Sequence, residues 1–291
     1  MSHKTYNLFF GAMILISSIA PSSAQEASLS KLLRQARAAI ASDSRLKEVK
    51  SFSAVFNIRH VLFRGDQASG EVRLDFLLSD KLLKNETWDL PGNVGQVISS
   101  FLLNGEQTWS DVHTTSSKIP ILRDDSVNAE NERTALFQSL RKENAFYLLQ
   151  LLLMAPSYAP VEFVYAGEAQ AEDGRADVLD VKGLSDFTVR LYFDKESHQL
   201  LMMSYQEPAS QGVLFARGRA GNRSTKPGET PKEQSTEVKL HFSDYRAEDG
   251  IVVPHLITED RDGKTIEEKK LKSFKINPAF KPGHFEIKRK S

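Results

Sequence analysis

The chain has 291 residues, of which 40% are hydrophobic and 26% are charged, so it can bury one large core or two smaller ones. Lysine and arginine together number 38, as do aspartate and glutamate, and the zero net charge lacks the basic surplus of a nucleic-acid-binding protein. We therefore expect no nucleic-acid partner. The sequence contains no cysteine, which excludes disulfides, thiol nucleophiles and thiol acylation.

The N-terminal segment has the pattern of an export signal. Lys4 precedes an apolar run, Leu8–Ala20, and small residues lead up to Ala24 at the positions that a signal peptidase reads. We predict cleavage after Ala24, which leaves a soluble, monomeric periplasmic protein with a single domain, residues 25–291. The alternative is a membrane anchor, but the apolar run is shorter than the roughly 20 residues that span a bilayer core.

The first part of the mature chain predicts one helix followed by strands. Apolar residues recur at helical spacing and indicate an amphipathic helix at Leu29, Leu32, Leu33, Ala36 and Ile40. Apolar and polar residues then alternate, which is the period of a half-buried strand, over Phe52–Leu62 and Val72–Leu78, with a turn predicted at 64–70. Shorter strands are predicted at Glu86–Leu90, Val97–Leu103 and Gln107–Ser110, the last two joined by a type I′ turn at Asn104-Gly105.

A central helix is predicted from Thr134 to Met154, ended by Pro156. Its C-terminal half is apolar around almost the whole circumference, so it must be buried on more than one side. One interpretation is a core helix that is sandwiched within the domain. The other is a lid or plug that lies in a concave sheet. The helix is too short and too interrupted to span a membrane.

The remainder of the chain predicts more sheet. Four strands are expected at 161–165, 176–181, 187–193 and 200–205, followed by a polar segment, 207–236, that we predict to be a mobile loop. Val238–Ile276 predicts a three-stranded antiparallel meander, because turns at Ala247–Gly250 and Asp262-Gly263 separate runs of β-branched and aromatic residues. In its first strand we expect Val238, Leu240 and Phe242 to share the buried face.

The familiar motifs of catalysis and metal binding do not occur in the sequence. The histidines of the mature chain lack spacings such as His-x-x-x-His, and there is neither a Gly-x-Ser-x-Gly elbow nor a Gly-x-x-x-x-Gly-Lys phosphate loop. Asp260–Gly263 resembles the middle of a calcium loop, but Lys269 would then stand where an acidic ligand is needed. We therefore expect no catalytic residues, no metal and no cofactor.

Three local patterns follow one another in an order that resembles a known family. They are the first strand pair followed by Asn104-Gly105-Glu106-Gln107-Thr108-Trp109; then Arg175–Leu179, Leu191–Asp194 and His198–Leu201; and finally Asp244-Tyr245-Arg246, Asp249–Pro254 and Ile276-Asn277-Pro278. Together they resemble the LolA-like periplasmic lipoprotein carriers and outer-membrane lipoprotein-sorting proteins. The resemblance implies an α+β, mainly β fold: a half-open, many-stranded antiparallel β-barrel with an N-terminal helix and the central apolar helix as lid or plug.

One departure from the family pattern concerns the second strand of the barrel. The carriers have an Arg-Pro pair there, and the arginine points into the cavity to regulate release of the lipoprotein. In this sequence Phe76 and Leu77 stand at the corresponding place. The departure argues against hand-over of lipoproteins to an outer-membrane receptor, but it does not affect the expectation of an apolar cavity.

The resemblance implies a soluble, non-catalytic carrier or chaperone for a lipid, an acyl chain or an acylated protein, with an inner-membrane transporter or an outer-membrane receptor as protein partner. An alternative is a lipid- or partner-binding sensor of envelope stress with the same fold, and a third interpretation is an enzyme with an unrecognised site. The predicted apolar cavity is lined by Phe56, Ile58, Leu74, Phe76, Trp88, Phe101, Trp109, Leu148, Leu149, Leu152 and Leu153.

Overall fold

The computed structural model describes residues 23–62, 65–78, 80–117, 129–171, 174–184, 187–208 and 235–287. Most of the predicted signal segment and most of the predicted mobile loop, 209–234, lie outside these residues. The ends of that predicted loop belong to strands instead, because one strand continues to Pro208 and the next begins at Ser235.

Helices make up the smaller part of the described chain. They are α1 (Ser23–Ile40), α2 (Asp43–Glu48), the short η1 (Pro91–Asn93) and α3 (Ala129–Leu152). The predicted N-terminal helix is present as α1, which begins two residues before the predicted mature N-terminus. Helix α2 was not predicted from the sequence. It is short, and Ser42 caps its first turn by accepting a hydrogen bond from the Arg45 backbone.

Within the described residues, twelve antiparallel strands form one sheet. They are β1 (Ser51–Val61), β2 (Gln67–Leu77), β3 (Lys81–Asp89), β4 (Gln96–Asn104), β5 (Gln107–Thr114), β6 (Glu162–Ala171), β7 (Gly174–Leu184), β8 (Phe187–Asp194), β9 (Leu200–Pro208), β10 (Ser235–Glu248), β11 (Ile251–Arg261) and β12 (Lys264–Ile276). All of the predicted strands are present, most of them longer than the sequence indicated.

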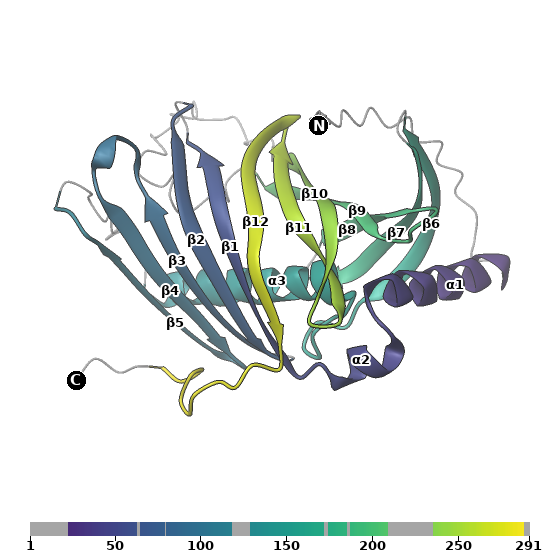
Figure 1. Ribbon diagram of the computed structural model, residues 1–291, viewed down its shortest axis with the longest axis horizontal. Helices are drawn as coiled ribbons and strands as arrows, with labels where there is room; N and C mark the ends of the chain where they lie inside the picture. The colour runs from purple at the N-terminus through teal and green to yellow at the C-terminus, as the bar shows by residue number, and fades with distance from the viewer. Residues whose placement is uncertain are drawn as a thin grey trace, which may run out of the picture.

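The strand order is that of two meanders joined in the middle of the sheet. β1–β5 follow one another, β6–β12 do the same, and β1 pairs with β12 to connect them. The edges are β5 and β6, so the sheet is curved but not closed (Figure 1). Helix α3 lies inside the curve, and the predicted fold, an open antiparallel barrel with an N-terminal and a central helix, is confirmed.

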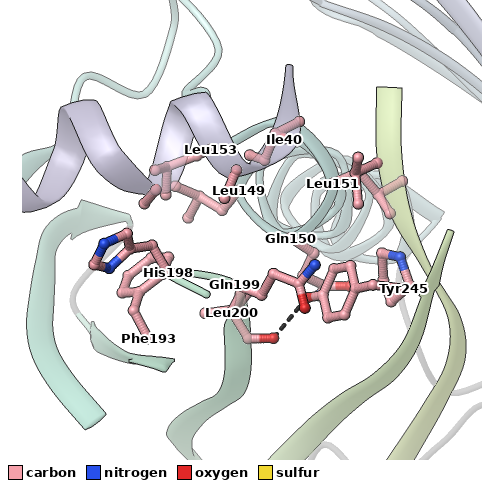
Figure 2. Close-up of a pocket in the computed structure, with 14 residues that line it drawn as sticks. Ile40, Leu149, Gln150, Leu151, Leu153, Phe193, His198, Gln199, Leu200 and Tyr245 are labelled. Atoms are coloured by element: carbon pink, nitrogen blue, oxygen red, sulfur yellow. Dashed lines mark hydrogen bonds between the residues drawn. The ribbon is translucent and has the colours of Figure 1, made fainter. Parts of the chain in front are cut away.

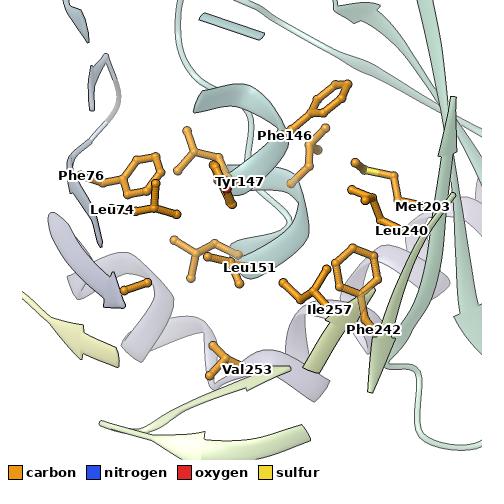
Figure 3. Packing of buried hydrophobic residues seen from close by; sticks show 14 of the residues in the cluster. Leu74, Phe76, Phe146, Tyr147, Leu151, Met203, Leu240, Phe242, Val253 and Ile257 are labelled. Carbon is orange, nitrogen blue, oxygen red and sulfur yellow. The ribbon is translucent and has the colours of Figure 1, made fainter. Parts of the chain in front are cut away.

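The main hydrophobic core fills the space between α3 and the concave face of the sheet. Figure 3 shows α3 side chains between Leu74 and Phe76 of one meander and Met203, Leu240 and Phe242 of the other. The Phe76 ring stacks on Phe52 of β1 at 4.3 Å between centroids. Because both meanders contribute to this core, α3 packs against both halves of the sheet.

Two of the predicted turns have the expected geometry and one does not. Asp249-Gly250 and Asp262-Gly263 both have positive φ at both residues, as a type I′ turn requires. Asn104 instead pairs with Gln107, so the loop is Gly105-Glu106, and of these two described residues only Gly105 has a positive φ, 60°. The prediction of a type I′ turn there is wrong, because a glycine at the first loop position gives type II′.

Gly70 lies inside β2 and not in the turn where the sequence placed it. It pairs with Trp88 of β3, and a Cβ atom at this position would lie 2.1 Å from the carbonyl oxygen of Thr87. Glycine is therefore needed for the close approach of two backbones. The sequence pattern suggested a turn because glycine has the same turn propensity wherever it stands.

Candidate functional site

The N-terminal and C-terminal parts of helix α3 differ in how far their side chains are exposed. Its first residues, 130–135, are exposed, whereas every side chain from Asn144 to Leu153 is at most 8% exposed. A helix that is apolar on all sides must be surrounded by protein or by ligand. In this structure the surroundings are the concave face of the sheet, α1 and the segment that follows α3.

The structure brings ten of the eleven predicted cavity residues together, but as close-packed core. Phe56, Ile58, Leu74, Phe76, Trp88, Phe101, Leu148, Leu149, Leu152 and Leu153 belong to the same buried cluster. Trp109 does not, because it lies half-buried on the edge strand β5. The expected open apolar cavity is therefore filled by α3 in this state, and the assignment of these residues to a ligand stays a prediction.

A small cavity remains at the C-terminal end of α3, with a volume of about 20 Å³. Figure 2 shows Leu149 of α3 and Leu153, which follows the helix, above the cavity with Ile40 of α1, and Phe193 and Leu200 of the sheet on the opposite side. Such a volume holds about one water molecule. Of the residues predicted to line a cavity, these two leucines are the ones that border it.

The chain reverses direction immediately after α3 at a strained residue. Leu153 has a φ of 49°, a left-handed conformation that costs a non-glycine residue roughly 1–2 kcal/mol. Its side chain is 1% exposed, so packing holds the backbone in this conformation. The following segment returns to the helix, where the Tyr158 hydroxyl accepts a hydrogen bond from Asn144 at 2.6 Å.

The concave face also carries charge, which the sequence analysis did not predict. Next to the apolar residues, the same face carries ionisable side chains that are 13–26% exposed. We call this set the charged belt: His60, Lys84, Glu86, Lys142, Glu143, Glu207, Glu259, Arg261, Glu267 and Lys269. These residues come from six different helices and strands, so they are far apart in the sequence.

One arm of the charged belt runs from β9 to β1. Arg261 contacts Glu207 at 2.6 Å and Glu259 at 2.7 Å. On the neighbouring strands, Glu267 lies 2.7 Å from Lys269 and 3.2 Å from the His60 ring. These contacts follow from strand register, which places Glu259 opposite Glu267 and Glu267 opposite His60.

Helix α3 joins this arm to the other wall through two adjacent residues. Lys142 reaches Glu207 of β9 at 3.5 Å, and Glu143 accepts from Lys84 of β3 at 3.0 Å. Lys84 also lies 3.3 Å from Glu86. Because β3 and β9 stand on opposite sides of the β1–β12 pair, the two contacts tie the helix to both meanders.

The ionisation of the charged belt reflects the competition between burial and pairing. Burial opposes the charged form of Lys84, but Glu143 and Glu86 raise its pKa above the usual value. Burial likewise opposes ionisation of Glu267, but Lys269 and His60 lower its pKa to about 2. For Lys142 burial prevails over Glu207, so its pKa is lowered. Pairing therefore prevails over burial at Lys84 and Glu267, whereas burial prevails at Lys142.

A serine, an aspartate and a histidine meet on the opposite face of the sheet without forming a catalytic triad. Asp75 is fully buried and accepts hydrogen bonds from Ser53 at 2.6 Å and from Arg73, and it contacts His284 at 2.9 Å. In a triad the histidine contacts the serine, whereas here the aspartate separates them. The arrangement instead fastens the C-terminal segment to β1 and β2.

Neither a metal site nor a membrane span is found in the described part of the chain. No group of three or more histidine, cysteine, aspartate or glutamate side chains there is placed to hold a metal ion. The helices among the same residues all lack the combination of length and apolarity that crossing a bilayer requires.

Comparisons with known proteins indicate a distant likeness. No family model matches the sequence, and no curated protein matches it. The structure is similar to an outer-membrane lipoprotein-sorting protein domain from Vibrio parahaemolyticus, with 9% identity, 88% of this chain and 95% of that one covered, and a TM-score of 0.44. It is also similar to a LolA superfamily protein from Nitrosomonas europaea, with 10% identity, coverage of 86% and 94%, and a TM-score of 0.41.

A third likeness is to a DUF1329 family protein from Desulfovibrio piger, with 11% identity, coverage of 89% and 97%, and a TM-score of 0.42. The first two structures carry the names of the family that the sequence motifs resemble. These likenesses concern the fold alone.

Proposed function

We propose that this protein is a non-catalytic periplasmic carrier that binds a lipid, an acyl chain or the lipid part of an acylated protein on the concave face of its sheet. The observation that supports this most is the apolar, fully covered half of α3, residues 144–153, lying in an open sheet. An acyl chain and the side chains of α3 can cover the same apolar wall in turn.

The energetics of such an exchange are favourable for a long acyl chain. Burial of each CH₂ group gains about 0.8 kcal/mol, so a chain of ten or more carbons gains on the order of 8 kcal/mol before the cost of moving the helix. The cavity of about 20 Å³ cannot hold such a chain. Binding therefore requires α3 to move away from the sheet.

The contacts of α3 permit this movement. Across the described residues, the backbone hydrogen bonds at its C-terminal end, Leu153 to Leu149 and Met154 to Leu148, stay within the segment itself. Helix and sheet are joined by apolar packing and by side-chain pairs such as Lys84–Glu143 and Lys142–Glu207. Side-chain contacts of this kind can be exchanged for ligand contacts without breaking the sheet.

The proposal can be tested by fixing α3 to the sheet. The natural chain has no cysteine, so a double variant Lys84→Cys/Glu143→Cys can be joined specifically with a short bis-maleimide across the 2.9 Å pair that it replaces. We expect the unlinked variant to bind a fluorescent fatty acid and the linked protein to bind it at least ten-fold more weakly. Fluorescence titration of both forms measures the difference.

A matched control links two strands on the outer face, where Arg190 of β8 and Asp180 of β7 form a pair at 2.6 Å. The linked Arg190→Cys/Asp180→Cys variant should keep the affinity of its unlinked form. Equal binding by the linked and unlinked α3 variants would contradict the proposed movement. Failure of the wild-type protein to bind any fatty acid or lysophospholipid would contradict the carrier function itself.

A further inference from the structure

We propose that the ligand is an amphiphile with a zwitterionic headgroup that carries both a phosphate and a primary ammonium, and that the charged belt holds this headgroup. The inference rests on the proposed function and adds the chemical class of the ligand. It arises from the division of one concave face into an apolar part and a charged part.

The two parts are continuous along individual strands. On β11, Ile257 is 2% exposed within the core, and Glu259 and Arg261 follow it on the same face at 15% and 22% exposed. On β3, fully buried Leu82 is followed on the same face by Lys84 and Glu86, and then by Trp88, which is 7% exposed. A ligand whose tail lies along the apolar part therefore has its polar end at the charged belt.

The balance of charge favours a headgroup with both signs. Four basic side chains, Lys84, Lys142, Arg261 and Lys269, stand among five acidic ones, Glu86, Glu143, Glu207, Glu259 and Glu267. A purely anionic headgroup would meet the carboxylates and displace them from their cations. A zwitterion exchanges partners instead, because its phosphate can take a lysine or arginine while its ammonium takes the carboxylate that is released.

Helix α3 connects this exchange to the movement of the helix. Lys142 and Glu143 are its own members of the charged belt, and the Lys142 ammonium lies over the rings of Phe146 and Tyr205 at 5.5 Å and 5.2 Å. When α3 moves, Lys84 and Glu207 each lose one partner. Beside Lys84, a phosphate can replace Glu143 while the ammonium pairs with Glu86; alternatively, beside Glu207, the ammonium can replace Lys142 while the phosphate pairs with Arg261.

Competition experiments with ligands of equal chain length test the headgroup. We would measure displacement of the fluorescent fatty acid by lauroyl lysophosphatidylethanolamine, lauroyl lysophosphatidylglycerol and lauric acid. The ethanolamine lipid should compete at least ten-fold better than the glycerol lipid. Arg261→Gln should reduce this ratio by at least five-fold, because it disturbs the pairs of Glu207 and Glu259 together.

Arg190→Gln is the matched control, because Arg190 forms a similarly buried pair with Asp180 on the outer face. It should leave the ratio unchanged. If Arg261→Gln does not fold, Lys142→Gln serves in its place, because its pair with Glu207 is longer at 3.5 Å. Equal competition by the two phospholipids would overturn the headgroup inference and leave the carrier function standing. Absence of competition by all three ligands would instead count against the carrier function.

Discussion

Glu267 illustrates at the scale of a residue how this sheet tolerates charge on its inner face. It is 14% exposed and keeps its charge because Lys269 lies at 2.7 Å and His60 at 3.2 Å. Removing one member of such a buried pair typically costs 3–5 kcal/mol, since the partner is left without compensation. The charged belt is therefore a set of mutually dependent residues and not a group of separate surface pairs.

The lowered pKa of Glu267 predicts a specific loss of stability in acid. Its folded pKa of about 2 lies below the ordinary 4.5, so its contribution to stability is complete above pH 4.5 and is lost as the pH falls toward 2. The shift corresponds to roughly 3 kcal/mol. We expect Glu267→Gln to be less stable than the wild type at pH 7 and the difference to shrink by about this amount at pH 2. Urea denaturation at several pH values measures it.

Glu268→Gln is the control for this measurement, because Glu268 lies on the other face of β12 and pairs with Arg59 in a more exposed position. Solvent screens that pair, so its substitution should change the pH dependence much less. A constant difference between Glu267→Gln and the wild type from pH 7 to pH 2 would contradict the assigned pKa.

At the same scale, the sequence predicted which residues are buried better than it predicted what they contact. Alternation placed His60 on the face of Phe56 and Ile58, and the structure confirms this. Its contact with Glu267 could not be predicted, because the two residues meet only through the pairing of the first strand with the last. The same reason explains why the charged belt is invisible in the sequence.

At the scale of an element, α3 shows what periodicity can and cannot indicate. The apolar run correctly predicted a helix segment that is buried all round, although the helix ends at Leu152 and not at the predicted Met154. The same pattern fits a core helix and a plug equally well. The helix also begins at Ala129, before the predicted Thr134, because its first turns are polar and exposed. Only the open sheet around it distinguishes a removable helix from an ordinary core helix.

The position of the small cavity predicts that alanine substitutions at two leucines of α3 reduce the stability of the protein unequally. Leu149 borders the cavity, whereas Leu152 is 0% exposed and is not among the residues that line it. Leu→Ala in a packed core costs about 2–5 kcal/mol, and we expect Leu152→Ala in the upper part of this range and Leu149→Ala near its lower end. Leu149→Ala should also bind the fluorescent fatty acid several-fold more tightly, because it weakens the packing that holds α3 against the sheet.

Chemical denaturation and fluorescence titration of the two variants decide between the interpretations of α3. Gln138→Ala, in the exposed N-terminal half, is the control and should change neither quantity. Large and equal losses of stability for both leucines, with unchanged binding, would indicate a plain core helix.

At the scale of the molecule, the pairing of β1 with β12 decides whether the two meanders are one unit. Local turns and alternation predicted each meander, since hairpins connect neighbours in sequence. The joint between them links Phe52 with Ile276, and Asn277 strengthens it by accepting hydrogen bonds from the Lys50 and Ser51 backbones at 2.8 Å and 3.1 Å. Pairing over such a sequence distance leaves no local signal, so the sequence indicated the pieces of the sheet but not their junction.

A single shared core predicts that the whole protein unfolds in one step. Both tryptophans, Trp88 and Trp109, lie in the β1–β5 meander, so their fluorescence reports on that half, whereas far-ultraviolet circular dichroism reports on both. Phe242→Ala removes a ring that is 3% exposed in the other meander and should cost about 3–5 kcal/mol. We expect the fluorescence and dichroism midpoints to coincide in the wild type and to shift together in the variant. A shift of the dichroism midpoint with an unchanged tryptophan midpoint would show that the two meanders unfold separately. In that case α3 would be docked on one meander and not shared by both.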